Sequence, residues 1–169
     1  MAETQTITLL PIAAPAEPSV ELEQSLPSDL AALTPVINNV MLLVARFRGP
    51  DDGQADIELA LHEALVNAVI HGNAEDPSKR VYVTTCCNAD GEVSITVRDQ
   101  GRGFDPKVVP DPTTAECKLC THGRGIHLMR ALMDEVSFEE GGTVVHIRKM
   151  ARRREQMTQP LGAFEASQQ

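Results

Sequence analysis

Three polar residues, Glu63, Asn67 and His71, recur at intervals of four in an otherwise apolar stretch of the chain. In a helix, this spacing places the three side chains along one face. The ordinary interpretation is a solvated stripe, but the apolar neighbours predict a helix that is buried on most sides. A buried carboxylate and carboxamide need a metal, a water or a ligand as partner. The Asn67 oxygen suits Mg²⁺ that already carries phosphates, and Glu63 can orient or deprotonate a nucleophile beside it.

A glycine-rich stretch, Asp99-Gln100-Gly101-Arg102-Gly103-Phe104-Asp105, directly follows an expected strand. Its glycines allow tight turning and a close approach of the backbone to a ligand. An aspartate at a strand end can accept a hydrogen bond from an amine such as that of adenine. The alternative is a plain surface turn with a capping aspartate.

A second glycine pair opens an expected helix in Gly123-Arg124-Gly125-Ile126. The backbone N–H groups at a helix start, together with the positive end of its dipole, favour an anion. The pair alone predicts only a turn from loop to helix. It supports a ligand site only through its order and spacing relative to the other two stretches. The sequence holds no Gly-x4-Gly-Lys-Ser/Thr loop and neither the His-Arg-Asp nor the Asp-Phe-Gly kinase motif. A nucleotide site here must therefore be of another design.

Short strands and helices alternate around these stretches. Ser28 is the expected cap of the first helix, Pro35 predicts a kink or a later helix start, and Gly72-Asn73 ends the second helix. Asp90-Gly91 predicts a hairpin turn, and a final hairpin turns at Glu140-Gly141-Gly142. The order is strand, two helices, two strands, an irregular stretch, a helix and two strands, over residues 20–26, 30–47, 55–71, 81–87, 93–97, 101–122, 125–133, 136–138 and 143–147. This order predicts an α+β sandwich with a mostly antiparallel sheet.

The chain of 169 residues fits one domain over residues 20–150, with a flexible lead-in over 1–19 and a flexible tail over 151–169. Its net charge of −9 argues against a nucleic-acid partner, and an aromatic content of 3% without tryptophan argues against stacking on single strands. No apolar run approaches the roughly 20 residues that span a bilayer, and the N-terminus lacks a signal-peptide layout. We therefore expect a cytoplasmic protein without a membrane partner. Its cysteines are then reduced thiols: Cys86, Cys87, Cys117 and Cys120.

In this order, the three stretches resemble those of the GHKL ATPases, the class of gyrase, heat-shock chaperone, histidine kinase and MutL. Glu63 to Asn73 is similar to the N box, and the other two stretches are similar to the first and second glycine boxes. The following residues, 128–136, resemble the anti-sigma-factor serine kinases of the RsbW type. The resemblance covers roughly residues 20–150 and implies a Bergerat-type two-layer sandwich, with helices on one face of the sheet and a mobile lid over Mg²⁺ and ATP.

The resemblance also implies roles for individual residues. Glu63 would be the general base, Asn67 the Mg²⁺ ligand and Asp99 the acceptor for the adenine amine, which Thr143 would support through water. The residues implied to contact the cofactor are Asn67, His71, Asp99, Gly101, Gly103, Phe104, Gly123, Arg124, Gly125, Ile126 and Thr143. A kinase of this family sequesters a sigma factor and phosphorylates a serine of an antagonist protein, and a homodimer is also expected.

Several alternatives stay open on the sequence alone. The basic residue near the γ-phosphate is one of Lys107, Lys118, His122 and Arg124. Cys117 and Cys120 are ordinary lid residues in one interpretation and a redox or metal site in another. The whole domain is either a kinase, an ATP-dependent binding module without chemistry or, ranked last, a detached histidine-kinase catalytic domain.

Overall fold

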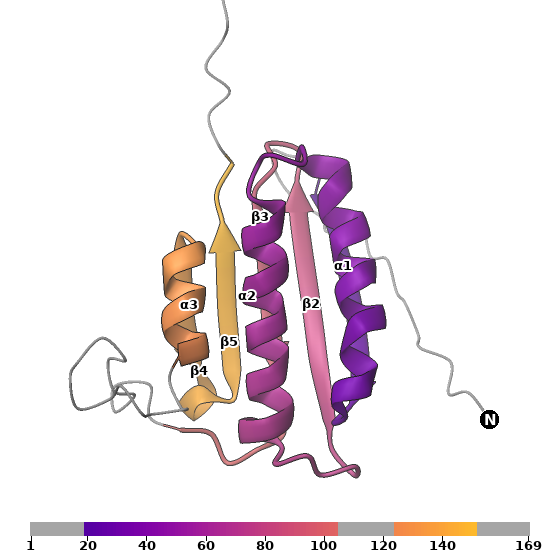
Figure 1. The fold of residues 1–169 in the computed structure, drawn as a ribbon, viewed down its shortest axis with the longest axis vertical. Coiled ribbons are helices and arrows are strands. Elements are labelled where there is room, and N and C mark those ends of the chain that lie inside the picture. The colour runs from indigo at the N-terminus through magenta and orange to yellow at the C-terminus, as the bar shows by residue number, and fades with distance from the viewer. Residues whose placement is uncertain (1–18, 105–123, 152–169) are drawn as a thin grey trace, which may run out of the picture.

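The computed structural model describes residues 19–104 and 124–151 (Figure 1). In chain order, its strands and helices are β1 (Ser19–Pro27), a 3-10 turn (Leu30–Ala32), α1 (Leu33–Phe47), α2 (Gln54–Val66), a π-helical turn (Asn67–Gly72), β2 (Arg80–Asn88), β3 (Val93–Arg98), α3 (Arg124–Leu132), β4 (Glu135–Glu139), a 3-10 turn (Glu140–Gly142) and β5 (Val144–Lys149).

The strands form one sheet in the order β1-β2-β3-β5-β4, and every neighbouring pair in it is antiparallel. The three helices cover one face of this sheet, with α2 between α1 and α3 (Figure 1). The β2–β3 hairpin turns where predicted, with a positive φ of 89° at Gly91. The predicted α+β sandwich, with its antiparallel sheet and helices on one face, is confirmed.

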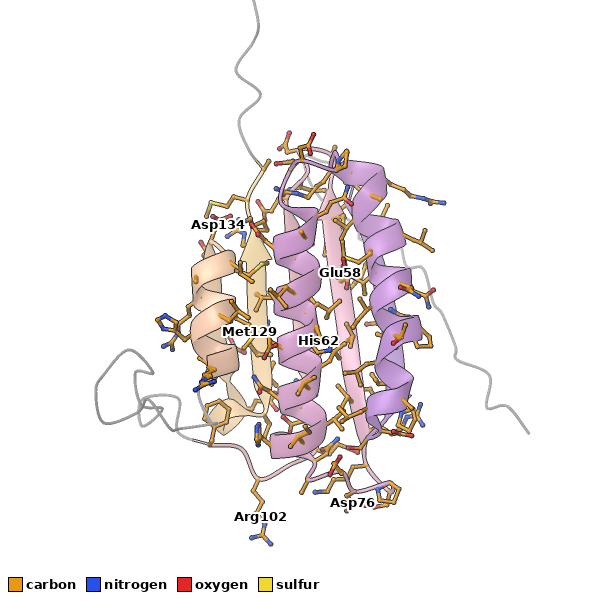
Figure 2. All side chains as sticks on the ribbon, viewed as in Figure 1. Glu58, His62, Asp76, Arg102, Met129 and Asp134 are labelled. Carbon is orange, nitrogen blue, oxygen red and sulfur yellow. The ribbon has the colours of Figure 1, made fainter. Side chains whose placement is uncertain are left out.

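The core lies between the sheet and the helices and is aliphatic. Alternate residues of β2 and β3 face the helices, because successive side chains of a strand point to opposite sides. The aliphatic residues of β2 and β3 on this side are Val81, Val83, Val93, Ile95 and Val97. On α2, Ile57, Leu61 and Leu65 have no exposed side chain, and Met129 of α3 lies on the side toward α2 (Figure 2). Burying each such side chain contributes about 1.5–3 kcal/mol relative to leaving it in water.

The start of the first helix differs from the sequence prediction. Ser28 is buried and caps nothing, whereas Asp29 accepts a hydrogen bond from the N–H of Ala31 at 2.9 Å and caps the short 3-10 turn. The α-helix itself begins at Leu33, so the later start that Pro35 predicted is correct. Pro35 is the third residue of α1, where a backbone N–H has no partner within the helix in any case.

The end of the second helix also differs. The helix is α-helical only to Val66 and continues as a π-helical turn to Gly72, closed by the N–H of Asn73 on the carbonyl oxygen of Ala68 at 2.8 Å. Gly72 is not a left-handed cap, which corrects the prediction. The positive φ values lie two and three residues beyond it, at Ala74 (57°) and Glu75 (54°). Gly72 must therefore be a glycine for a reason other than its φ.

One helical stretch in the described part of the chain, residues 30–47, is long and apolar enough to cross a membrane by length and composition. Its inner side packs on the sheet through buried residues such as Val36, Val40 and Val44. This is the arrangement of a core helix in a two-layer domain. Leu30 and Leu42 on its outer side are 41% and 69% exposed.

Candidate functional site

The start of α3 lies directly against the last turn of α2. A Cβ added to Gly125 would lie 2.6 Å from Oε2 of Glu63 and 3.2 Å from Nδ2 of Asn67. Such distances exclude a side chain at residue 125 unless Glu63 moves. The structure therefore brings the first and third sequence stretches together. It also corrects the degree of burial, because the Glu63 side chain is 26% exposed and Asn67 is partly exposed rather than enclosed.

The second sequence stretch meets the end of the same helical segment. A Cβ on Gly72 would lie 2.3 Å from Cγ of Asp99, and a Cβ on Gly101 would lie 2.0 Å from the carbonyl oxygen of Gly72. These two glycines let the π-helical turn and the loop after β3 touch backbone to backbone. The three stretches that the sequence singled out thus converge on one end of α2, the lower end in Figure 1.

Three consecutive backbone N–H groups in the loop after β3 each have a fixed acceptor. The N–H of Asp99 donates to the carbonyl oxygen of Thr143 at 3.0 Å, and that of Gln100 donates to Oδ1 of Asn73 at 2.8 Å. The N–H of Gly101 donates to Oδ1 of Asp99 itself at 2.7 Å. The backbone at Asp99 and Gln100 is therefore held by Thr143, directly before β5, and by Asn73, directly after the π-helical turn.

The carboxyl group of Asp99 is half-buried at the centre of this arrangement. Burial raises the pKa of Asp99, and the hydrogen bond from Gly101 and the charge of Lys79 lower it by less. Its Oδ2 oxygen accepts no hydrogen bond from any described residue, whereas Oδ1 is occupied. A half-buried acceptor oxygen of this kind suits an N–H donor on a ligand.

The far side of the glycine-rich loop packs on the β4–β5 connection. Gly103 has a φ of 71°, and a Cβ there would lie 2.1 Å from the carbonyl oxygen of Gly141, so only glycine fits. The N–H of Phe104 donates to this same carbonyl at 2.7 Å. The Phe104 ring meets Phe138 edge to face, with ring centroids 5.5 Å apart. These contacts indicate that Gly103 and Phe104 hold the loop in place.

The remaining residues of the expected site are spread more widely. Ile126 is buried in the core, Arg124 and His71 are exposed, and Thr143 meets Asp99 through its backbone carbonyl while its hydroxyl donates to the carbonyl of Glu140. Figure 2 shows Arg102 pointing away from the ribbon at the same end. The other residues named from the sequence lie outside the described residues: Gly123, Lys107, Lys118, His122, Cys117 and Cys120.

Two polar residues that shape the site were not predicted as site residues. Asn73 is completely buried and donates through Nδ2 to the carbonyl oxygen of Arg80 at 3.0 Å. Gln100 accepts, through Oε1, a hydrogen bond from the N–H of Arg80 at 2.8 Å. The only sequence signal was an asparagine after His71-Gly72, which local pattern assigns to a helix end. Its partners are adjacent only in three dimensions.

The residues present fit a nucleotide with Mg²⁺. Among residues 19–104 and 124–151, no group of three or more His, Cys, Asp or Glu side chains could hold a metal by itself. Mg²⁺ does not need such a group, because it keeps several water ligands and takes substrate phosphates beside one or two protein oxygens. Asn67 is the residue that could supply one such oxygen, and the glycine at residue 125 keeps the space next to it clear.

Comparisons with known proteins match residues 26–149 to the histidine kinase-like ATPase domain. The chain is 38% identical to the anti-sigma F factor of Heyndrickxia coagulans over 97 residues, which cover 54% of this chain and 66% of that protein. It is 34% identical over 117 residues to the anti-sigma F factor of Clostridium botulinum (strain Eklund 17B / Type B), covering 65% and 80%. With that of Geobacillus stearothermophilus it shares 35% identity over 115 residues, covering 65% and 78%.

Proposed function

Because the chain belongs to the histidine kinase-like ATPase domain family, we propose that it binds ATP with Mg²⁺ and transfers phosphate to a serine of an antagonist protein. In this proposal it is an anti-sigma-factor kinase that regulates transcription by partner switching. The observation that carries the proposal is the packing of Gly125 on Glu63 and Asn67, which joins a carboxylate and an amide oxygen at the start of a helix.

Each residue has a chemical task in this proposal. Bound ATP supplies the γ-phosphoryl group, and Mg²⁺ neutralises charge on its phosphates. Glu63 accepts the proton of the serine hydroxyl while the new O–P bond forms and the bond to the ADP oxygen breaks. Asn67 holds the metal, and Oδ2 of Asp99 accepts a hydrogen bond from the adenine amine. The backbone amides at the start of α3 face the phosphates.

A sigma factor is the second partner that we propose. The support is the printed name of the relatives, anti-sigma F factor, at 34–38% identity. We expect binding of the sigma factor to depend on the bound nucleotide, because the start of α3 belongs both to the proposed nucleotide site and to the protein surface next to it. Co-purification of the chain with candidate sigma factors, with and without Mg²⁺ and ATP, tests this partner.

Transfer of label from γ-labelled ATP to the antagonist protein tests the kinase activity. We expect transfer by the unaltered chain and a loss of about 10²–10⁴-fold in Glu63→Gln, with the Kd for ATP nearly unchanged. Asn67→Ala is expected to weaken binding only when Mg²⁺ is present. Transfer that survives in both variants contradicts the assigned roles. Tight ATP binding without any phosphorylated product identifies the alternative function, a binding module that inhibits its partner without chemistry.

Self-association is a further part of the proposal, through the outer side of α1. Residues 30–45 contain no charged side chain, and Leu42 is 69% exposed. On a chain with a net charge of −9, an uncharged side lets two copies approach without direct repulsion between acidic side chains. Light scattering of Leu42→Glu, with the exposed Leu59→Glu on α2 as control, tests it. We also propose a cytoplasmic location, which cell fractionation tests.

A further inference from the structure

Asn73 occupies the junction between the π-helical turn, the start of β2 and the loop after β3. Its side chain is completely buried, with 0% exposure, and both ends of its amide are used. Nδ2 donates to the carbonyl oxygen of Arg80 at 3.0 Å, and Oδ1 accepts from the N–H of Gln100 at 2.8 Å. A fully satisfied buried amide of this kind specifies one geometry for the segments that it joins.

These bonds form a closed ring with the side chain of Gln100. The N–H of Arg80 donates to Oε1 of Gln100 at 2.8 Å, so Arg80 and Gln100 are linked to each other as well as to Asn73. The backbone of Asn73 is itself held by its N–H on Ala68 and by its carbonyl, which accepts from Asp76 at 3.2 Å. The ring therefore connects the residue after Asp99 to a rigid part of the fold.

The position of a carboxylate, rather than its presence, decides which base it selects. Adenine presents an amine at the ring carbon where guanine presents a carbonyl oxygen. A carboxylate held opposite that atom attracts adenine and repels guanine. A carboxylate that can shift along the base edge can instead accept from the ring N–H and the amine that guanine carries. Asp99 is thus selective for adenine only while its backbone stays where it is.

We infer that Asn73 is a positioning residue that determines the preference of this site for adenine over guanine nucleotides, by holding the N–H of Gln100 and with it the carboxylate of Asp99. This inference rests on the proposed function, since it requires that the site binds ATP. It assigns no contact between Asn73 and the nucleotide, because the buried amide has both of its hydrogen bonds within the protein.

The experiment measures the Kd of ATP and of GTP, each with Mg²⁺, by calorimetry on the full chain. We expect Asn73→Ala to lower the ratio of the two affinities by about 10-fold, mainly through weaker ATP binding. Asn73→Asp keeps an acceptor for the N–H of Gln100, so its ratio should lie closer to that of the unaltered chain. The matched control is Asn39→Ala, which removes another asparagine hydrogen bond, Nδ2 on Oε1 of Gln24 at 2.9 Å, in α1.

The outcomes separate a positioning role from a merely structural one. Equal weakening of ATP and GTP in Asn73→Ala, with an unchanged ratio, overturns the inference while the proposed function stands. If Asn73→Ala does not fold, Asn73→Ser decides, because the serine hydroxyl is too short to hold the N–H of Gln100 but keeps a polar atom in the buried position. A lowered ratio in Asn73→Ser supports the inference, and an unchanged ratio overturns it. If the unaltered chain binds neither nucleotide, the proposed function fails and the inference fails with it.

Discussion

Gly72 lies against the carboxylate of Asp99, so closely that a Cβ at residue 72 would fall 2.3 Å from Cγ and 2.5 Å from Oδ2 of Asp99. Residue 72 has no positive φ, so its identity is set by space and not by backbone conformation. The contact joins the π-helical turn to the loop that holds the proposed adenine acceptor. Any side chain at residue 72 must displace Asp99 or the turn itself.

Gly72→Ala is therefore expected to weaken ATP binding by at least about 10-fold and to lower stability by about 1–3 kcal/mol through overpacking. Calorimetry and thermal unfolding measure the two effects. Gly49→Ala is the control, because a Cβ at Gly49 meets nothing within 4 Å and its φ is not positive. Unchanged ATP affinity in Gly72→Ala would show that Asp99 does not contact the nucleotide or that the turn yields freely.

Gly125→Ala should separate stability from activity. Alanine is the better helix former by up to about 1 kcal/mol, and the atom it meets belongs to the mobile end of Glu63, so the protein should remain at least as stable. The displaced carboxylate, however, no longer lies where it can accept the serine proton. We expect phosphate transfer to fall by about 10²-fold or more, approaching Glu63→Gln, while the melting temperature holds or rises. Full activity in this variant would contradict the role of Glu63.

The raised pKa of Asp99 predicts two pH dependences. In the proposed function, nucleotide binding needs the ionised carboxylate of Asp99, so we expect ATP affinity to start falling at a higher pH than it would for a carboxyl with the ordinary pKa of 3.8. A carboxyl whose pKa is higher in the folded than in the unfolded protein is harder to ionise in the folded state. It therefore lowers the free energy of unfolding once the pH exceeds its pKa in the unfolded chain. Without nucleotide, Asp99→Asn should thus be more stable than the unaltered chain at neutral pH.

Thermal unfolding of both proteins from acid to neutral pH checks this sign. The stability difference should shrink as pH falls toward the unfolded pKa of 3.8 and should vanish below it. The same Asp99→Asn variant should bind ATP poorly at every pH, because an amide has one acceptor oxygen where the carboxylate has two. One of the two carboxylate oxygens accepts from Gly101, and the proposed function needs the other for the adenine amine. A stability difference that grows toward acid pH would show that burial does not dominate at Asp99.

Arg48 should matter for stability and not for the site. Its guanidinium is buried at the opposite end of the sandwich, where it donates to the carbonyl oxygens of Gly91 and Met150 and pairs with Asp52 at 3.1 Å. Arg48→Met removes this donor from the buried carbonyl oxygen of Gly91 and is expected to cost about 1–3 kcal/mol. Denaturant unfolding measures the loss, with the exposed Arg46→Met as control. ATP affinity of the folded variant should match that of the unaltered chain.

The two neighbouring cysteines of β2 should react differently. Burial raises the pKa of Cys87 to about 12, whereas Cys86 is partly exposed with a pKa raised by less. A thiolate is the reactive form, so Cys87 should stay unmodified by iodoacetamide in the folded protein and react after unfolding. Peptide mass mapping distinguishes the two sites. Rapid modification of Cys87 under native conditions would reveal local opening of the β1–β2 pair.

Much of the fold was predictable from local pattern. Asp90-Gly91 between the expected strands 81–87 and 93–97 predicted the β2–β3 hairpin. The apolar neighbours of Glu63 predicted the burial of α2, whose Leu61 and Leu65 have no exposed surface. Cys86 and Cys87 of β2 follow the two-residue period of a strand, since Cys86 is partly exposed and Cys87 is buried. Local pattern predicts these elements because the burial of one face of a strand or helix requires apolar residues at regular positions in one continuous segment of the chain.

The local predictions that failed concern segment ends. Ser28 matched the residue type of a helix cap, yet Asp29 is the residue that caps, and the helix expected to end in a glycine cap ends in a π-helical turn. The type of a residue shows only which structural roles it can take, such as a helix cap. The choice between neighbouring candidates depends on which hydrogen bonds the rest of the fold completes.

For the site, the sequence alone determined the participating residue types and the three stretches that contain them. Only the tertiary structure decided how they meet: Gly125 on Glu63, Gly72 on Asp99, and the buried amide of Asn73 between two loops. The physical reason is that these contacts join residues separated in the chain, and their distances are set by the packing of α2 on the sheet beside α3 (Figure 1). A glycine that turns the chain and a glycine that makes room for a carboxylate are identical in sequence and differ only in what lies opposite them.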